Sequence, residues 1–208
     1  MYRLASLLFL ISIVNGLQLQ GPCDLTNITY ITAPNVNEVV GRWYEIERIP
    51  NDYQKGDCPS WTITASTQNN VTSRVDISIQ EVVNGIVATR NGVITTSGNG
   101  TFQTTFSDGV LLPFVILNTN YKEYAVLYSC IYNGQISELL AWKLSRTQVT
   151  SNTTKTAFQD YTNLSKGSNW TLLSHTDSAC KASNNAINIH ISPVILLIAT
   201  FLITKELF

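Results

Sequence analysis

Four cysteines have the widest chemical range of any residues in this chain. No two of them form the C-x-x-C pair that zinc and redox sites use, and they lie far apart, at Cys23, Cys58, Cys130 and Cys180. An even number of widely spaced cysteines predicts two disulfides and an oxidising compartment. If all four are oxidised, no thiol remains to act as a nucleophile or a metal ligand.

Histidine and methionine are almost absent from the body of the chain. His190 lies in an apolar C-terminal tail, so His175 is the one histidine outside that tail, and no histidine cluster is available for a metal. Met1 is the single methionine, so no thioether can reduce a peroxide. We therefore expect a protein that is not an enzyme and that uses no metal and no cofactor.

Both ends of the chain carry the features of processing segments. Residues 1–16 combine one basic residue, an apolar run and a small residue, which predicts a secretory signal peptide; a membrane anchor would need a longer run. Small residues after Cys180, a short spacer and an apolar tail predict exchange for a glycosylphosphatidylinositol (GPI) anchor, with residues 185–208 removed. Asn184 fits best as the attachment site and Ser183 is the alternative. A membrane span is the competing interpretation of this tail.

Six N-x-Ser/Thr acceptor sites support export through the secretory pathway. They predict surface glycans at Asn27, Asn70, Asn99, Asn152, Asn163 and Asn169. A formal net charge of −1 gives no basic surface for nucleic acid.

Residues 17–184 form one predicted domain that is nearly all strand. Turn residues, including the hairpin-forming pairs Asn84-Gly85 and Asn133-Gly134, separate runs rich in β-branched and aromatic residues. These runs are 41–48, 60–66, 71–83, 86–96, 101–106, 114–119, 123–132 and 136–145. The segment 149–164 has helical spacing, a short strand is expected at 170–174, and residues 37–40 predict one helical turn. Eight consecutive antiparallel strands favour a closed barrel, and a two-sheet sandwich remains the alternative.

Three short motifs on these elements resemble the fingerprint of the lipocalin family. They are Gly41-x-Trp43 on the first strand, Thr119-Asn120-Tyr121 before the seventh, and Arg146 after the eighth. The resemblance covers Cys23 to Cys180 and is closest to the branch of apolipoprotein D and the insect GPI-anchored lipocalin Lazarillo. It implies an all-β fold: an eight-stranded antiparallel up-and-down β-barrel with one C-terminal α-helix packed outside and a short ninth strand.

The resemblance also assigns structural roles to several residues. It implies that the indole of Trp43 fills the floor of the barrel and that the guanidinium of Arg146 lies over it, neither of them touching ligand. It implies disulfides Cys23–Cys130 and Cys58–Cys180. Asn120 replaces the aspartate that is usual in the second motif, which removes a charge but keeps a turn-forming residue.

A concave apolar cavity inside such a barrel is the expected site. Trp142 is similar in position to a pocket-wall tryptophan of the resembling branch, and strand parity places Leu140 and Leu144 on its face. Leu127 is expected to face inward because Cys130, on the opposite parity, should lie outside. Trp61 and Phe114 are aromatic candidates near the open mouth. Packing without ligand contact remains the alternative for each.

Residues Val110 to Phe114 are expected to form an apolar loop at the open end of the barrel. Exposed apolar loops often mark membrane or partner contact. The loop would therefore dip into lipid, or fold back over the cavity as a lid.

The resemblance implies extracellular binding and transport of a small hydrophobic molecule such as a fatty acid, a retinoid or a sterol, at the cell membrane. A second hypothesis is a cell-surface guidance or adhesion glycoprotein with a protein partner, acting in neurogenesis and using the barrel as a scaffold.

Overall fold

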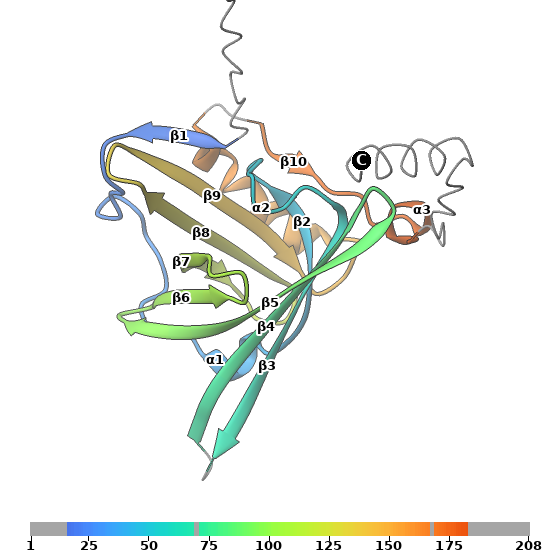
Figure 1. Ribbon diagram of the computed structural model, residues 1–208, viewed down its shortest axis with the longest axis horizontal. Coiled ribbons are helices and arrows are strands. Elements are labelled where there is room, and N and C mark those ends of the chain that lie inside the picture. The colour runs from blue at the N-terminus through green and yellow to red at the C-terminus, as the bar shows by residue number, and fades with distance from the viewer. Residues whose placement is uncertain (1–15, 69–70, 167–168, 183–208) are drawn as a thin grey trace, which may run out of the picture.

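One antiparallel sheet curls into a closed barrel (Figure 1). The computed structural model describes residues 16–68, 71–166 and 169–182. Strands β2 to β9 follow one another around the barrel, and the last pairs with the first. Their bounds are β2 Gly41–Arg48, β3 Asp57–Gln68, β4 Val71–Val83, β5 Ile86–Gly98, β6 Thr101–Phe106, β7 Leu111–Thr119, β8 Tyr124–Tyr132 and β9 Ile136–Ser145.

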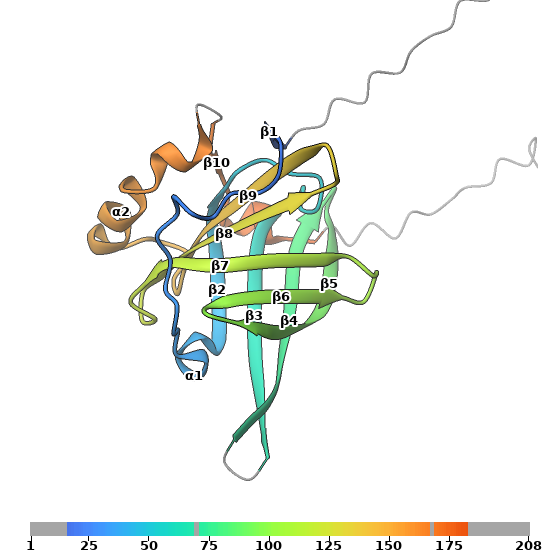
Figure 2. The ribbon, with the colours of Figure 1, turned by 90° about the vertical axis from the view of Figure 1, so that its left-hand side faces the viewer.

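Closure of this sheet confirms the predicted barrel and rules out the sandwich. Tyr44 of β2 pairs with Ser145 of β9, and Arg48 pairs with Trp142, with a bulge between Glu45 and Glu47. Closure removes the unpaired edges that an open sheet of eight strands would leave. The β3–β4 hairpin continues past the start of β2 and projects beyond one end of the barrel (Figure 2).

Short elements cover the outside of the barrel. Helix α2 (Asn152–Gln159), followed by the 3₁₀ turn η1 (Thr162–Ser165), confirms the predicted C-terminal helix, and β10 (Thr171–Leu172) confirms the short last strand. Helix α1 (Val36–Val39) forms the expected turn before β2, and α3 (Asp177–Cys180) is the last element of the described chain. None of the helices in the described ranges is both long and apolar enough to cross a membrane.

Strand β1 (Leu17–Gln20) was not predicted. It pairs with the first half of β9, from Ile136 to Leu139. From β1 the chain runs down the outside of the barrel to α1 at the opposite end (Figure 2).

Alternating side chains on the strands build two apolar cores. The inner core fills the barrel, and the outer core lies beneath α2 and the N-terminal arm. Leu127 belongs to the inner core while Cys130 packs on the outer one, as parity predicted.

The prediction of an apolar loop at Val110–Phe114 is wrong. Strand β7 begins at Leu111, which pairs with Thr105, and Phe114 pairs with Phe102. Leu112 is 7% exposed and belongs to the inner core, whereas Leu111 is 52% exposed. The turn before β7 is formed instead by the polar residues Ser107-Asp108-Gly109, so this segment is neither an apolar loop nor a lid.

The two predicted processing segments lie outside the described residues, apart from Gly16. The proposed anchor sites Ser183 and Asn184 lie outside them as well.

Candidate ligand-binding site

The closed end of the barrel is built around Trp43 and Arg146. Trp43 is 1% exposed, and the Cζ atom of Arg146 lies 3.7 Å from the centroid of its ring. The indole N–H of Trp43 donates to the carbonyl of Val39 in α1 at 2.8 Å. Gly41 has a φ of +109°, and a Cβ there would lie 3.0 Å from Nη1 of Arg146. The glycine is therefore needed for the guanidinium to reach the indole.

Arg146 fastens three segments to this end of the barrel. Its guanidinium donates to the carbonyls of Glu38, Arg42 and Tyr121 at 2.8 to 3.0 Å. Burial lowers the pKa of Arg146 from its ordinary value. The hydroxyl of Tyr121 accepts from the backbone N–H of Asn35, so the fingerprint residues act together as one cap.

The second motif holds the turn between β7 and β8. The Thr119 hydroxyl accepts from the N–H of Tyr121 at 2.8 Å and donates to the carbonyl of Tyr124 at 2.6 Å. The Asn120 side-chain oxygen accepts from the N–H groups of Glu123 and Tyr124. An amide in place of the usual carboxylate therefore keeps the turn bonds.

An apolar cavity of about 50 Å³ lies above this floor. Its lining combines α1 with side chains from all eight strands of the barrel: Val36, Val39, Trp43, Trp61, Ile63, Val75, Ile77, Ile94, Phe102, Phe114, Ile116, Ala125, Leu127 and Leu144. Small-molecule sites usually measure roughly 300 to 1,000 Å³. The predicted hollow is present but is much smaller than a ligand of that class needs.

A buried polar network fills the interior between this cavity and the mouth. Glu45 is fully buried; its Oε1 accepts from Arg48 at 2.9 Å and its Oε2 accepts from Gln54 and from the indole of Trp61, each at 2.8 Å. The indole N–H of Trp142 donates to Oε1 of Gln54 at 2.7 Å. Desolvation raises the pKa of Glu45, and the charge of Arg48 opposes this shift. Every contact to Glu45 comes from a donor, as an ionised carboxylate requires.

The segment Ile49–Gly56 holds Gln54 in this position. The side-chain oxygen of Asn51 accepts from the backbone N–H groups of Tyr53 and Gln54. Gly56 donates from its N–H to Glu81 at 2.8 Å, and its carbonyl accepts from Arg48 at 3.1 Å. A Cβ on Gly56 would lie 2.7 Å from the carbonyl oxygen of Val82, so only glycine lets the segment lie this close to β4.

The predicted site residues fall into two groups. Trp61, Phe114, Leu127 and Leu144 line the cavity, whereas Trp142 and Leu140 belong to the inner core without lining it. Trp61 was expected near the mouth, but it lies nearer the closed end because it pairs with Trp43 on the neighbouring strand. Phe114 stacks on Phe102 with ring centroids 5.2 Å apart.

Trp43 also departs from the expectation that it stays out of the site. One face of its ring meets Arg146, yet the indole is part of the cavity lining as well. Arg146 does not line the cavity.

The polar network was missed from the sequence. Glu45 shares the parity of Trp43, which places it on the inner face, but a charged residue in an apolar barrel was not anticipated. Gln54 lies in the segment between β2 and β3, where no periodic pattern indicates whether a side chain points into the barrel.

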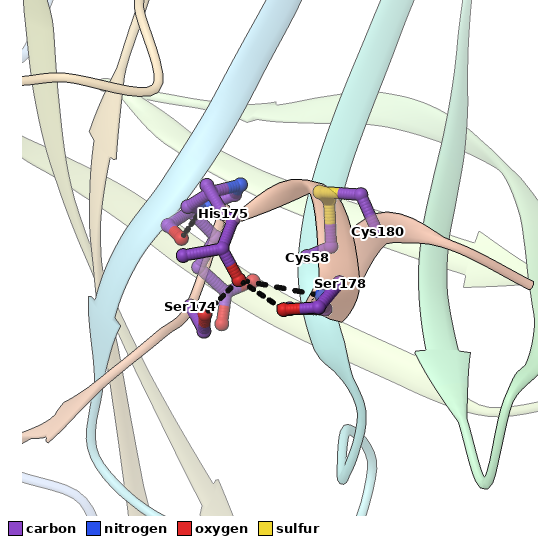
Figure 3. Close-up of a disulfide and its surroundings, with 8 residues drawn as sticks. Cys58, Ser174, His175, Ser178 and Cys180 are labelled. Carbon is purple, nitrogen blue, oxygen red and sulfur yellow. Dashed lines mark hydrogen bonds between the residues drawn. A yellow bond between two sulfur atoms is a disulfide. The ribbon is translucent and has the colours of Figure 1, made fainter.

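Two disulfides fasten the terminal arms to the barrel, in the pairing that the resemblance implied. Cys23 is joined to Cys130 on β8, and Cys58 at the start of β3 is joined to Cys180 in α3. His175 lies beside the second disulfide (Figure 3), with its ligand atom within 4.8 Å of both sulfurs. Its Nε2 donates to the carbonyl of Glu45 at 2.7 Å. Because both sulfurs are bonded to each other, they offer no thiolate to a metal ion.

Five of the predicted glycan acceptors lie in the described residues. All five are exposed: Asn27, Asn99, Asn152, Asn163 and Asn169. Asn70 lies outside the described residues.

Comparisons with known proteins agree with this geometry. Residues 40–176 match the Lipocalin / cytosolic fatty-acid binding protein family. Apolipoprotein D of Cavia porcellus is 35% identical over 105 residues, covering 46% of this chain and 51% of that protein. Apolipoprotein D of Macaca fascicularis is 31% identical over 116 residues, covering 53% and 59%. The chain thus matches little more than half the length of these curated relatives.

Solved structures share the fold at low sequence identity. Insecticyanin from the tobacco hornworm Manduca sexta has a TM-score of 0.69 at 20% identity, covering 81% of this chain and 94% of that one. Lobster apocrustacyanin A1 has a TM-score of 0.60 at 21% identity, covering 71% and 83%.

Proposed function

The chain belongs to the lipocalin family, and from this we propose that it binds and carries a small hydrophobic molecule outside the cell. The observation that supports this proposal is the cavity lining, which is apolar throughout and lies inside a closed barrel. Fatty acids, retinoids and sterols are the ligand classes that we propose. The protein acts as a carrier rather than as an enzyme.

Binding requires the mouth of the barrel to open, because the cavity of about 50 Å³ cannot hold such a molecule. The segment Ile49–Gly56 is the part that must move. Hydrogen bonds of Gln54, Gly56 and Arg48 hold it to the barrel, together with the packing of Ile49 in the outer core and of Tyr53 against the inner core, and opening must break some of these contacts. The ligand then packs against the inward side chains, with Trp142 and Leu140 joining the lining.

Saturable quenching of tryptophan fluorescence by a retinoid tests this function. We expect quenching in the wild-type chain and in Trp170→Phe, since Trp170 packs outside the barrel on Lys143. Trp142→Ala should lose part of the signal, because Trp43 and Trp61 line the cavity and remain to be quenched. The absence of saturable quenching in the wild-type chain would contradict the proposal.

A GPI anchor at Asn184 or Ser183 would hold the barrel at the outer surface of the plasma membrane. Cys180 is joined to Cys58, which lies two residues beyond Gly56. The anchor would therefore keep the open end of the barrel near the bilayer, where apolar molecules can be exchanged. Release from intact cells by a phosphatidylinositol-specific phospholipase tests the anchor, and retention after treatment would argue for a membrane span.

The small cavity favours a second candidate function. A barrel with an almost filled interior can serve as a scaffold for a cell-surface guidance or adhesion glycoprotein, with glycans at the exposed acceptor sites. A tight protein partner together with no saturable ligand binding would support this alternative.

A further inference from the structure

The side-chain amide of Gln54 occupies a position that requires both a donor and an acceptor of hydrogen bonds. Its oxygen accepts from the indole N–H of Trp142 at 2.7 Å, and its nitrogen donates to Oε2 of Glu45 at 2.8 Å. All three residues are at least 95% buried. When the mouth opens and Gln54 leaves, Trp142 loses its acceptor and Glu45 loses one of its donors.

This position adjoins the apolar cavity. Trp61 lines the cavity and donates from its indole to the same Oε2 of Glu45 at 2.8 Å. Its ring meets that of Trp142 edge-on, with centroids 5.6 Å apart. A ligand in the barrel can therefore contact the apolar walls and, at the same time, the indole N–H of Trp142 and Oε2 of Glu45.

We propose that the carried molecule is an apolar chain with a neutral head group that both donates and accepts hydrogen bonds, and that this head group replaces the amide of Gln54 between Trp142 and Glu45. The inference rests on the proposed carrier function. A primary amide reproduces the pattern of Gln54, and a hydroxyl is the smallest group that can both donate and accept.

Other head groups leave the position incompletely satisfied. An ester accepts from Trp142 but donates nothing to Glu45. A carboxylate also only accepts, and it adds a second negative charge beside a buried carboxylate. A buried polar group that loses its partner is costly, so the difference in affinity should be large.

Four molecules with one oleyl chain test the head group directly: oleamide, oleyl alcohol, oleic acid and methyl oleate. The full-length chain is titrated with each of the four molecules separately, because oleamide and oleic acid have nearly the same mass, and the bound fraction is quantified by native mass spectrometry. We expect the amide and the alcohol to exceed the acid and the ester by at least about tenfold.

Three variants separate head-group recognition from general affinity. Glu45→Gln can donate as well as accept, so it no longer needs a donor from the head group and should reduce the preference to within about threefold. Trp142→Phe removes an N–H from which all four head groups can accept, so it should weaken binding but keep the preference. Gln54→Ala removes the internal competitor, so binding of the amide and the alcohol should rise relative to the ester. Trp170→Phe, outside the barrel, is the matched control and should keep the wild-type preference. Circular dichroism confirms that each variant is folded.

The results distinguish this inference from the proposed function. Equal complexes with all four molecules, or a preference for the acid or the ester, would overturn the inference while the carrier function stands. No complex with any of the four would contradict the carrier function and the inference with it.

Discussion

The Cζ atom of Arg146 lies 3.7 Å from the centroid of the Trp43 ring, at the end of the barrel opposite the segment Ile49–Gly56. A desolvated contact between a cation and an indole contributes up to about 2 kcal/mol. The same guanidinium bonds three backbone carbonyls, from Glu38, Arg42 and Tyr121. The closed end is therefore a rigid floor, and opening for a ligand must occur at the other end.

Gly41→Ala should weaken this floor more than the backbone penalty alone predicts. Gly109 offers a matched control, because its φ is +85° and a Cβ there meets nothing within 4 Å. We expect Gly109→Ala to lower the free energy of unfolding by about 1 to 2 kcal/mol. Gly41→Ala should cost about 1 kcal/mol more, because its Cβ pushes Arg146 away from Trp43. Urea denaturation measures both, and equal losses would show that the close approach is unimportant.

Leu111 and Leu112 should respond oppositely to substitution by serine. Leu112 is buried in the inner core, so Leu112→Ser should lower the free energy of unfolding by about 2 to 5 kcal/mol. Leu111→Ser should change it by no more than about 0.5 kcal/mol, because that side chain faces solvent. Similar losses in thermal denaturation would contradict the assignment of this segment to strand β7.

The two disulfides should contribute nearly equally to stability. Their sequence separations are 107 and 122 residues, for which chain entropy gives about 4 to 5 kcal/mol each. Replacing Cys23 and Cys130 together by serine should therefore cost about as much as replacing Cys58 and Cys180. Denaturant midpoints compare the two variants. A loss below about 1 kcal/mol for either pair would mean that its arm is held mainly by other contacts.

Glu138 should make stability fall as the pH rises above its ordinary pKa. Desolvation and the charge of Asp52 raise the pKa of Glu138 above 4.5 in the folded chain. The folded chain therefore binds this proton more tightly than the unfolded chain, so the stability gained below pH 4.5 is lost as the pH rises through the raised pKa.

Glu138→Gln tests this dependence. Between pH 4 and pH 7 the free energy of unfolding of the variant should rise relative to that of the wild-type chain. The expected rise is roughly a few tenths of a kcal/mol, a small value because the Glu138 side chain is partly exposed and screened by solvent. Thermal unfolding at several pH values measures the difference. A difference that stays constant across this range would contradict the raised pKa.

Most of the barrel could be predicted from local patterns. Strands β2, β4, β6 and β9 have the predicted bounds, because alternation and turn residues mark both ends of each. The start of β7 could not be placed, since Leu111, Leu112 and Pro113 break the alternation and proline disfavours a strand. Strand β1 was missed because its four residues directly follow the apolar N-terminal segment.

The site was less accessible from the sequence than the fold. Parity correctly placed Leu127, Leu140 and Leu144 inside the barrel. The direction of a loop residue such as Gln54 depends on how Asn51 and Gly56 fix the chain, which is a matter of tertiary structure. The size of the cavity also depends on how three large indoles and one polar network share the interior, and no periodic pattern reports this.

Extraction of the protein as it is secreted shows whether its barrel carries an apolar molecule. The chain is purified without detergent from a eukaryotic secretory host, and apolar molecules that leave it in organic solvent are quantified by mass spectrometry. Ala125→Leu is the control, because it adds bulk to the cavity that Ala125 lines. We expect about one equivalent of an apolar molecule per wild-type chain and much less in the control. The carrier function would be contradicted if the wild-type chain and Ala125→Leu both yielded only trace amounts of apolar molecules and neither took up added ligand.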